Sequence, residues 1–149
     1  MAKVTLSSQE QAEQLQISPE YVRISMAAAI ELGLKHGRTF RDVHCGCINL
    51  LQNYPEGCYA NCTYCGLARE RPGVPEDNTF IRVAWPLFPT DLVAEKIAEH
   101  QERVGRVCIA QVQDNRAYDD LIDMTVRVRR LSDVPISALV SATTLNEDR

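Results

Sequence analysis

Apolar residues recur in the first part of the chain at a spacing typical of a helix. Residues 1–17 are polar and are compatible with a helix or with an irregular lead-in. The segment Ser18-Pro19-Glu20 then has the sequence of a helix start, and Gly37 is a residue typical of helix ends. Between them an apolar residue recurs every four positions, which predicts one amphipathic helix over residues 18–37. The apolar residues are Val22, Met26, Ile30 and Leu34.

Three short apolar runs further along predict buried strands, at residues 47–51, 106–112 and 136–142. Two stretches between the runs have apolar residues three and four positions apart and predict helices. The first helix begins at Thr90 and ends at Gly105, and the second begins near Asp119. The predicted inner faces comprise Val93, Ala94, Ile97, Ala98, Gln101 and Val104 in the first helix, and Leu121, Met124, Val128 and Leu131 in the second.

The order strand, helix, strand, helix, strand predicts an α/β fold of parallel strands joined by helical crossovers. The nearly continuous apolar strands agree, because parallel sheets are covered on both faces. An eight-unit TIM-type barrel needs about 250 residues. The chain is therefore either a small open sheet or the first part of a barrel. Residues 144–149 resemble a strand-to-helix turn without its helix. We therefore expect a helical lead-in at 1–43 and, at 44–149, the first part of a barrel in a truncated or split protein.

Composition and charge narrow the class of protein. The chain has 149 residues, 45% of them hydrophobic and 24% charged, with a net charge of -4 and no run of Lys or Arg. This balance argues against a nucleic-acid-binding protein. No apolar run is long enough to cross a membrane, and the first residues do not resemble a secretory signal, so we expect a cytoplasmic protein. Six cysteines in such a chain indicate metal or redox chemistry instead of a disulfide scaffold.

The cysteines are clustered, five of the six within 21 positions. Cys58, Cys62 and Cys65 have the spacing Cys-x3-Cys-x2-Cys and follow the strand predicted at 47–51 after a turn at 53–57. Thiolates are the ligands of iron–sulfur clusters. Three of them can hold three corners of a cubane cluster and leave the fourth iron open to a small chelating cofactor. Loops that follow the strands of a parallel sheet are also where such folds bind ligands.

With the aromatic Tyr64 before the third cysteine, this pattern resembles the radical S-adenosylmethionine superfamily over residues 45–145. The resemblance implies a 4Fe–4S cluster on Cys58, Cys62 and Cys65, with S-adenosyl-L-methionine bound at the open iron. It implies reductive cleavage of S-adenosyl-L-methionine to methionine and a 5'-deoxyadenosyl radical, with electrons from a ferredoxin or flavodoxin type of donor. It also implies that Tyr64 lies near the adenine.

Many members of that superfamily carry a Gly-Gly-Glu-like segment after the second strand, where it helps to hold the methionine amino group. This chain has QVQDN at residues 111–115 and no Gly-Gly-Glu. By the resemblance, Gln113 and Asp114 are the candidates to replace it. Both residues are equally compatible with an ordinary loop.

Four segments are most similar to the biotin synthase and lipoyl synthase group, and in particular to the biotin-synthase-like component of two-subunit lipoyl synthases. They are YPEGC at 54–58, CGLARERPG at 65–73, TFIRV at 79–83 and VPIS at 134–137. This resemblance implies sulfur insertion into a protein-bound octanoyl chain. The implied partners are an octanoylated carrier protein or a small-molecule substrate, and a second radical S-adenosylmethionine subunit.

Sulfur insertion needs a sulfur source, and an auxiliary iron–sulfur cluster supplies it in both related enzymes. Cys45, Cys47 and Cys108 are the remaining cysteines and hence the candidate ligands of a second cluster. Cys108 resembles one auxiliary ligand of biotin synthase in position, but it is equally compatible with a small core thiol. Because the strand predicted at 136–142 has no cysteine, the biotin synthase cluster is not reproduced. Cys45 and Cys47 flank the start of the first strand, which in a parallel barrel lies at the end opposite the cofactor. A second cluster there would be far from the radical unless residues 38–46 fold back over the barrel mouth.

Three alternatives stay open. One is another biotin-synthase-like radical enzyme, such as a methylase or a maturation factor for a metallocofactor. The second is a structural zinc site that combines the three loop cysteines with Cys45 or Cys47. The third is an electron-transfer ferredoxin, which would need a fourth cysteine ligand.

Overall fold

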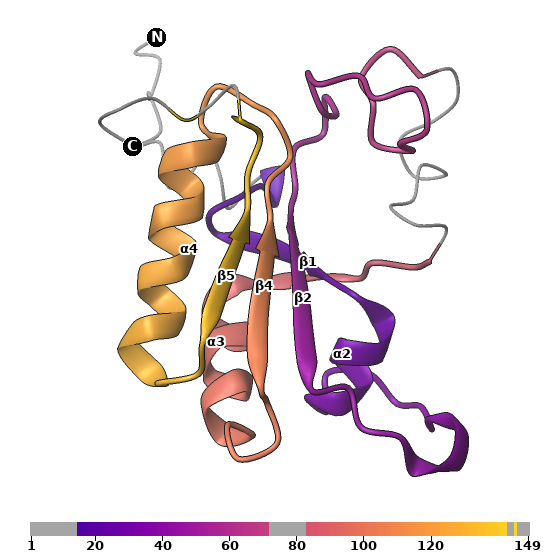
Figure 1. Ribbon diagram of the computed structural model, residues 1–149, viewed down its shortest axis with the longest axis vertical. Helices are drawn as coiled ribbons and strands as arrows, with labels where there is room; N and C mark the ends of the chain where they lie inside the picture. Colours follow the sequence, from indigo (N-terminus) through magenta and orange to yellow (C-terminus); the bar gives the residue numbers. More distant parts are fainter. Residues whose placement is uncertain (1–14, 72–82, 143–144, 146–149) are drawn as a thin grey trace, which may run out of the picture.

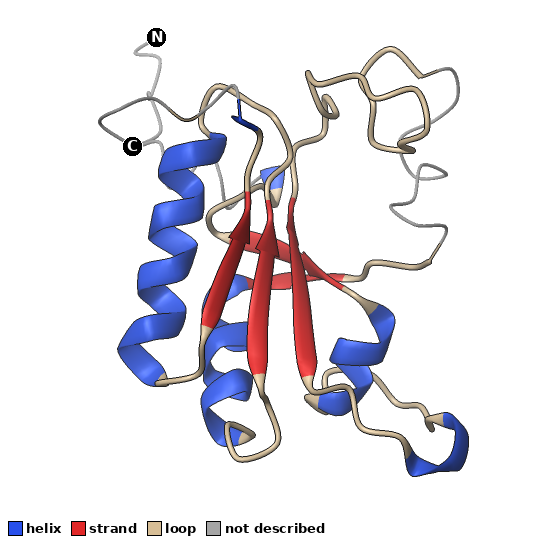
Figure 2. Ribbon diagram, viewed as in Figure 1, coloured by secondary structure: helices blue, strands red, loops and turns tan. Residues whose placement is uncertain are grey.

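The computed structural model describes residues 15–71, 83–142 and 145. Its strands form one five-stranded mixed sheet in the order β3-β1-β2-β4-β5 (Figures 1 and 2). The elements in chain order are β1 (Tyr21–Ile24), α2 (Met26–Glu31), a short 3-10 helix (Phe40–Asp42), β2 (Cys47–Gln52), β3 (Leu87–Pro89), α3 (Thr90–Glu99), β4 (Arg106–Ala110), α4 (Ala117–Leu131) and β5 (Ile136–Leu139).

The three predicted strands are present and parallel. β4 pairs with β2 on one side and with β5 on the other, and Val107 lies opposite both Ile48 and Ile136. Helix α4 connects β4 to β5, as the alternation of apolar patterns predicts. The prediction of an α/β fold is therefore confirmed, with strands that end earlier than expected, at Ala110 and Leu139.

The helices in the described part of the chain cover one face of the sheet, which differs from the predicted burial on both faces. Alternate residues of β2 and β4 are fully buried in one apolar cluster with α2, α3 and α4. Their neighbours on the opposite face, such as Cys47 and Cys108, are only half-buried. Burying a large apolar side chain contributes roughly 1.5–3 kcal/mol. Large fully buried side chains of this cluster include Ile48, Leu50, Ile97, Ile109 and Met124.

The helix predicted over residues 18–37 is wrong for its first part. Residues 21–24 form β1, antiparallel to both β2 and β3. Val22 and Ile24 are buried and alternate with half-buried residues, as in a strand with one face on the core. This alternation, and not the four-residue spacing of a helix, describes the structure of residues 21–24. The Ser18 hydroxyl accepts the Asn53 N–H, which ties the start of β1 to the end of β2. Only α2 is helical, and it begins after Ser25, whose Oγ accepts the Ala28 N–H.

A barrel is not confirmed. In a closed parallel barrel the last strand would pair with β2 on the side opposite β4. In this structure β1 occupies that place and runs antiparallel. Residues 15–43 thus contribute a strand to the same sheet as β2, and a domain boundary at residue 43 stays a prediction. Residues 1–14, 143–144 and 146–149, for which the sequence predicts a lead-in and a strand-to-helix turn, lie outside the described residues, as does most of the loop predicted over 66–79.

The apolar residues of the two long helices have the predicted helical spacing, but the helices begin or end at other residues than predicted. Helix α3 ends at Glu99, so Gln101 is exposed and not part of an inner face. The Thr90 hydroxyl donates to the Pro19 carbonyl instead of capping α3. Helix α4 begins at Ala117, and Leu131, expected on its inner face, is 49% exposed. None of the described helices is long and apolar enough to cross a membrane.

Candidate functional site

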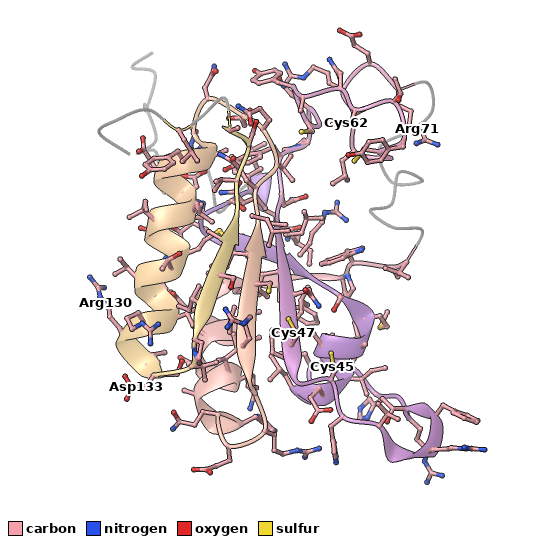
Figure 3. All side chains as sticks on the ribbon, in the orientation of Figure 1. Cys45, Cys47, Cys62, Arg71, Arg130 and Asp133 are labelled. Atoms are coloured by element: carbon pink, nitrogen blue, oxygen red, sulfur yellow. The ribbon has the colours of Figure 1, made fainter. Side chains whose placement is uncertain are left out.

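The three clustered cysteines lie in a closed loop beyond the carboxyl end of β2, where the sequence predicts a ligand-binding loop (Figures 1 and 3). We call residues 58–68 the cysteine loop. The Cys58 N–H donates to the Leu67 carbonyl at 2.7 Å, and the Arg69 N–H donates to the Cys58 carbonyl at 3.1 Å. These two hydrogen bonds close the neck of the loop and hold its ends together independently of any metal.

Gly57 permits this closure. Its φ of +80° is unfavourable for residues with a side chain, and a Cβ there would lie 2.9 Å from the Leu67 carbonyl oxygen. Leu67 is the acceptor that closes the neck, so backbone and not a movable side chain would be displaced.

We expect Gly57→Ala to lower the free energy of unfolding by about 2–4 kcal/mol, because backbone strain and steric overlap add together. It should also lower the iron retained after anaerobic reconstitution. Gly33→Ala is the matched control, since Gly33 has a φ of +69° but nothing within 4 Å of an added Cβ. In the control, the free energy of unfolding should fall by only about 1–2 kcal/mol, and the protein should keep its iron. If both variants lose the same stability and both keep their iron, the neck of the cysteine loop contributes neither to stability nor to iron binding.

Two of the three cysteines face one cavity. Cys62 and Cys65 line a cavity of about 250 Å³ together with Ala68 and Arg71. A turn sets their spacing, since the Cys65 N–H donates to the Cys62 carbonyl at 2.9 Å. Asn61 has a φ of +47°, a conformation that Asn tolerates better than most residues, and its side chain also accepts the Glu70 N–H.

Cys58 faces the loop that follows β4 instead. Its Sγ accepts the Gln113 N–H at 3.2 Å, and the Gln113 carbonyl accepts the Tyr59 N–H at 2.9 Å. The side-chain Oε1 of Gln113 is buried without a hydrogen-bond partner among the described residues. Asp114 is differently placed, because its Oδ1 accepts the Arg116 N–H at 3.1 Å in the turn before α4. Of the two candidates, only Gln113 thus combines a backbone contact to a cysteine with a buried side-chain acceptor that lacks a partner among the described residues.

Tyr64, the third cofactor candidate, is 86% exposed on the cysteine loop. Its placement near an adenine stays a prediction. The neighbouring Tyr59 is 38% exposed, and the Arg69 guanidinium lies 3.5 Å from the centroid of its ring. Arg69 also pairs with Glu56 at 2.9 Å, and no pattern in the sequence indicates these contacts. Within the described residues, no three His, Cys, Asp or Glu side chains are grouped closely enough to hold a single metal ion.

A buried polar contact that sequence reasoning missed anchors the approach to the cysteine loop. The Tyr54 hydroxyl, just after β2, donates to Asp120 Oδ2 of α4 at 2.6 Å. Arg116 lies 3.4 Å from the other oxygen of the same carboxylate. Burial raises the pKa of Asp120, although the hydrogen bond from Tyr54 and the Arg116 charge oppose the rise. The sequence predicts only a helix start near Asp119, and the role of Asp120 depends on the contact with Tyr54, 66 residues earlier in the chain.

We expect the stability of the protein to respond to pH through Asp120. A carboxyl group whose pKa is higher in the folded chain than in the unfolded chain stabilises the fold most below about pH 4. That contribution is lost as the pH rises through the folded-state pKa. The unaltered protein should therefore lose stability relative to Asp120→Asn as the pH rises from about 4 towards neutrality.

Chemical denaturation at a series of pH values measures this difference. Asp133→Asn, at an exposed carboxylate at the other end of α4 (Figure 3), controls for the loss of one negative charge. A difference between the unaltered protein and Asp120→Asn that does not change with pH, or that changes in the opposite direction, would contradict the assignment.

The other three cysteines form a second group around the start of β2. Cys47 and Cys108 are half-buried on the face of the sheet opposite the helices, and Cys45 packs against the apolar core cluster. Cys47 Sγ lies 3.4 Å from Cys108 Sγ, and Cys45 Sγ contacts the Cys47 carbonyl at 3.2 Å. Burial raises the pKa of the Cys47 thiol to about 11, and the neighbouring Cys108 adds to the rise. The structure thus brings together the cysteines predicted for a second cluster, and Cys108 is a half-buried partner of Cys47 instead of a core residue.

This second group lies at the opposite end of β2 from the cysteine loop (Figure 3). Cys45 is held there because its N–H donates to the buried carboxylate of Glu31 at 3.1 Å. The Gly46 carbonyl accepts the Gly105 N–H at 2.8 Å. Residues 38–46 therefore lie at the amino end of β2 and do not fold back over the carboxyl ends of the strands (Figure 1).

No protein-family model, no curated protein and no solved structure matches this chain. Membership of the radical S-adenosylmethionine superfamily thus stays a prediction that rests on the residues themselves and on their arrangement.

Proposed function

We propose that the protein is a radical S-adenosylmethionine enzyme whose 4Fe–4S cluster is held by Cys58, Cys62 and Cys65. The observation that carries the proposal is the closed cysteine loop beyond the carboxyl end of β2. It gathers three half-buried thiols in a single short segment, and its neck is fixed by backbone hydrogen bonds.

The chemistry of the donor groups fits such a cluster. The N–H of Gln113 that points at Cys58 Sγ is the kind of contact that stabilises a thiolate and tunes the reduction potential of a cluster. Cys62 and Cys65 border a cavity that offers space beside their thiols. When bound, the cluster supplies the electron that cleaves the carbon–sulfur bond of S-adenosyl-L-methionine. The protein's part is to hold the thiols, orient the cofactor and limit the access of water.

Gln113 supports the cofactor assignment. Leaving a buried acceptor unpaired costs about 1–3 kcal/mol. Gln113 Oε1 is such an acceptor, in the residue whose backbone N–H contacts Cys58 Sγ. An ammonium group of a ligand, such as the amino group of S-adenosyl-L-methionine, would satisfy it. In this proposal Gln113 takes the binding role, Asp114 shapes the turn before α4, and exposed Tyr64 is available to cover the adenine.

We further propose that β2, β4 and β5 are the first strands of a partial TIM-type barrel. The helices lie on one face of these strands, and the half-buried residues Cys47, Asn49 and Cys108 lie on the other, as they would around a barrel interior. Since β1 occupies the outer edge of β2, such a barrel would be open on that side.

Among radical reactions, the pair Cys47 and Cys108 favours sulfur insertion of the lipoyl synthase type, because two adjacent thiols can contribute ligands to a second cluster as a sulfur source. Since residues 38–46 do not fold back over the carboxyl ends of the strands, this proposal requires a substrate long enough to extend from the cysteine loop towards the amino end of β2. The proposed substrate is an octanoylated carrier protein or a small molecule. The proposed partners are a ferredoxin or flavodoxin type of electron donor and a second radical subunit, all in the cytoplasm. A biotin-synthase-like methylase or a maturation factor is the alternative if no carbon–sulfur bond forms.

Anaerobic reconstitution of the full chain tests the proposal. We expect about four irons and as much acid-labile sulfide for the first cluster. With a strong reductant, S-adenosyl-L-methionine should yield 5'-deoxyadenosine and methionine. Tight binding of one zinc without binding of iron would overturn the proposal. Product analysis on an octanoylated carrier domain, against a biotin precursor, then distinguishes the lipoyl type of reaction from the others.

A further inference from the structure

A second cavity lies between β1, the end of β2 and the cysteine loop. Its volume is about 110 Å³. A single water needs roughly 10–15 Å³ of such space, so the cavity has room for a larger polar group. The charged and polar side chains that line it include Arg23, Asn53, Tyr54, Glu56, Arg69 and Arg71.

Arg23 is a half-buried cation at this cavity without a charged partner. Its Nε donates to Asn53 Oδ1 at 2.7 Å, and its Nη1 donates to the Trp85 carbonyl at 3.4 Å. Both acceptors are neutral, and no carboxylate in the described part of the chain pairs with this guanidinium. Burial lowers the pKa of Arg23, as expected for a cation whose charge is not compensated. A partly buried charge of this kind favours the binding of an opposite charge.

The charges around the cavity do not balance. Among the described residues, three guanidinium groups line it against one carboxylate, that of Glu56. Glu56 already pairs with Arg69 at 2.9 Å, which leaves the charges of Arg23 and Arg71. Arg71 is exposed beside the cysteine loop (Figure 3) and also lines the cavity of Cys62 and Cys65. The two cavities therefore share a wall that carries a positive charge.

We propose that this cavity binds the anionic group of a ligand, a carboxylate or a phosphate, between Arg23 and Arg71. A planar guanidinium offers parallel N–H donors that match two oxygens of either anion. The two hydrogen bonds to Asn53 and Trp85 hold the Arg23 guanidinium in place, so little side-chain freedom is lost on binding. The anion site depends on no cluster and no cofactor.

Calorimetric titration of the full chain with pyrophosphate and, separately, with malonate tests the anion site. We expect at least one probe to bind and Arg23→Gln and Arg71→Gln each to weaken its binding roughly tenfold. Arg130→Gln is the matched control, because Arg130 is an exposed arginine on α4, away from the cavity (Figure 3). The control should bind the probe as the unaltered protein does.

Every outcome of these titrations supports or overturns the anion site. Binding of pyrophosphate alone identifies a phosphate site, and binding of malonate alone identifies a carboxylate site. Binding of neither probe, or an equal loss in Arg130→Gln, overturns the proposal. If Arg23→Gln does not fold by circular dichroism, Arg71→Gln decides, and unchanged affinity in that variant overturns the anion site. Because the titration uses no S-adenosyl-L-methionine, its failure leaves the proposed radical chemistry untouched.

Discussion

We expect replacement of Cys58, Cys62 and Cys65 by alanine to remove about four irons per chain and to abolish the cleavage of S-adenosyl-L-methionine. All three thiols of the cysteine loop are lost in this variant, and the nearest other group of cysteines lies at the opposite end of β2. Without thiolates the loop has no soft ligands for iron. The neck of the loop should still close, because its hydrogen bonds are formed by the backbone.

Iron analysis, acid-labile sulfide and the yield of 5'-deoxyadenosine measure this result. The matched control replaces Cys45, Cys47 and Cys108 by alanine, which removes the same number of thiols from the same chain. The control should keep its first cluster and its cofactor cleavage. Production of 5'-deoxyadenosine by the loop variant would end the radical interpretation.

The parallel part of the fold was predictable because its signals are local. Residues 47–51 form an apolar run too short for a helix, and the stripes of α3 and α4 have the helical period within one element.

β1 was missed because its sequence has two periods. Val22 and Met26 are four residues apart and extend the stripe of α2, whereas Val22 and Ile24 alternate as in a strand. The choice depends on partners far along the chain, since Val22 lies opposite Gln52 and Phe88. A sequence pattern contains no information about those pairings, and tertiary pairing overrides local preference here.

The cysteine loop was predictable from spacing, but the roles of the residues around it were not. Gln113 and Asp114 are adjacent in sequence, and only the contact between two loops distinguishes them. The closeness of Cys47 and Cys108 likewise needs the register of two strands 61 residues apart. The uncompensated charge of Arg23 depends on its being in a strand, where the sequence predicted a helix.

The second large effect concerns the thiols at the amino end of β2. We expect the double variant Cys45→Ala, Cys47→Ala to lose the iron beyond the first cluster, to keep cofactor cleavage and to form no carbon–sulfur bond. Cys47 Sγ is within 3.4 Å of Cys108 Sγ, so removing Cys47 breaks the pair that would hold a second cluster. Cys108→Ala alone should lose the same iron, because it breaks that pair from the other strand.

The raised pKa of Cys47, about 11, adds a condition to this result. Iron binds thiolates, so loading the second group must displace a proton that burial holds in place. The second cluster should therefore assemble more completely as the pH of reconstitution rises. The variant Cys45→Ser, Cys47→Ser keeps the size of the side chains and controls for packing at the start of β2. It should fold like the unaltered protein and still lack the extra iron. If the alanine double variant holds as much iron as the unaltered protein at every pH, these thiols are structural, and sulfur must reach the substrate from another source.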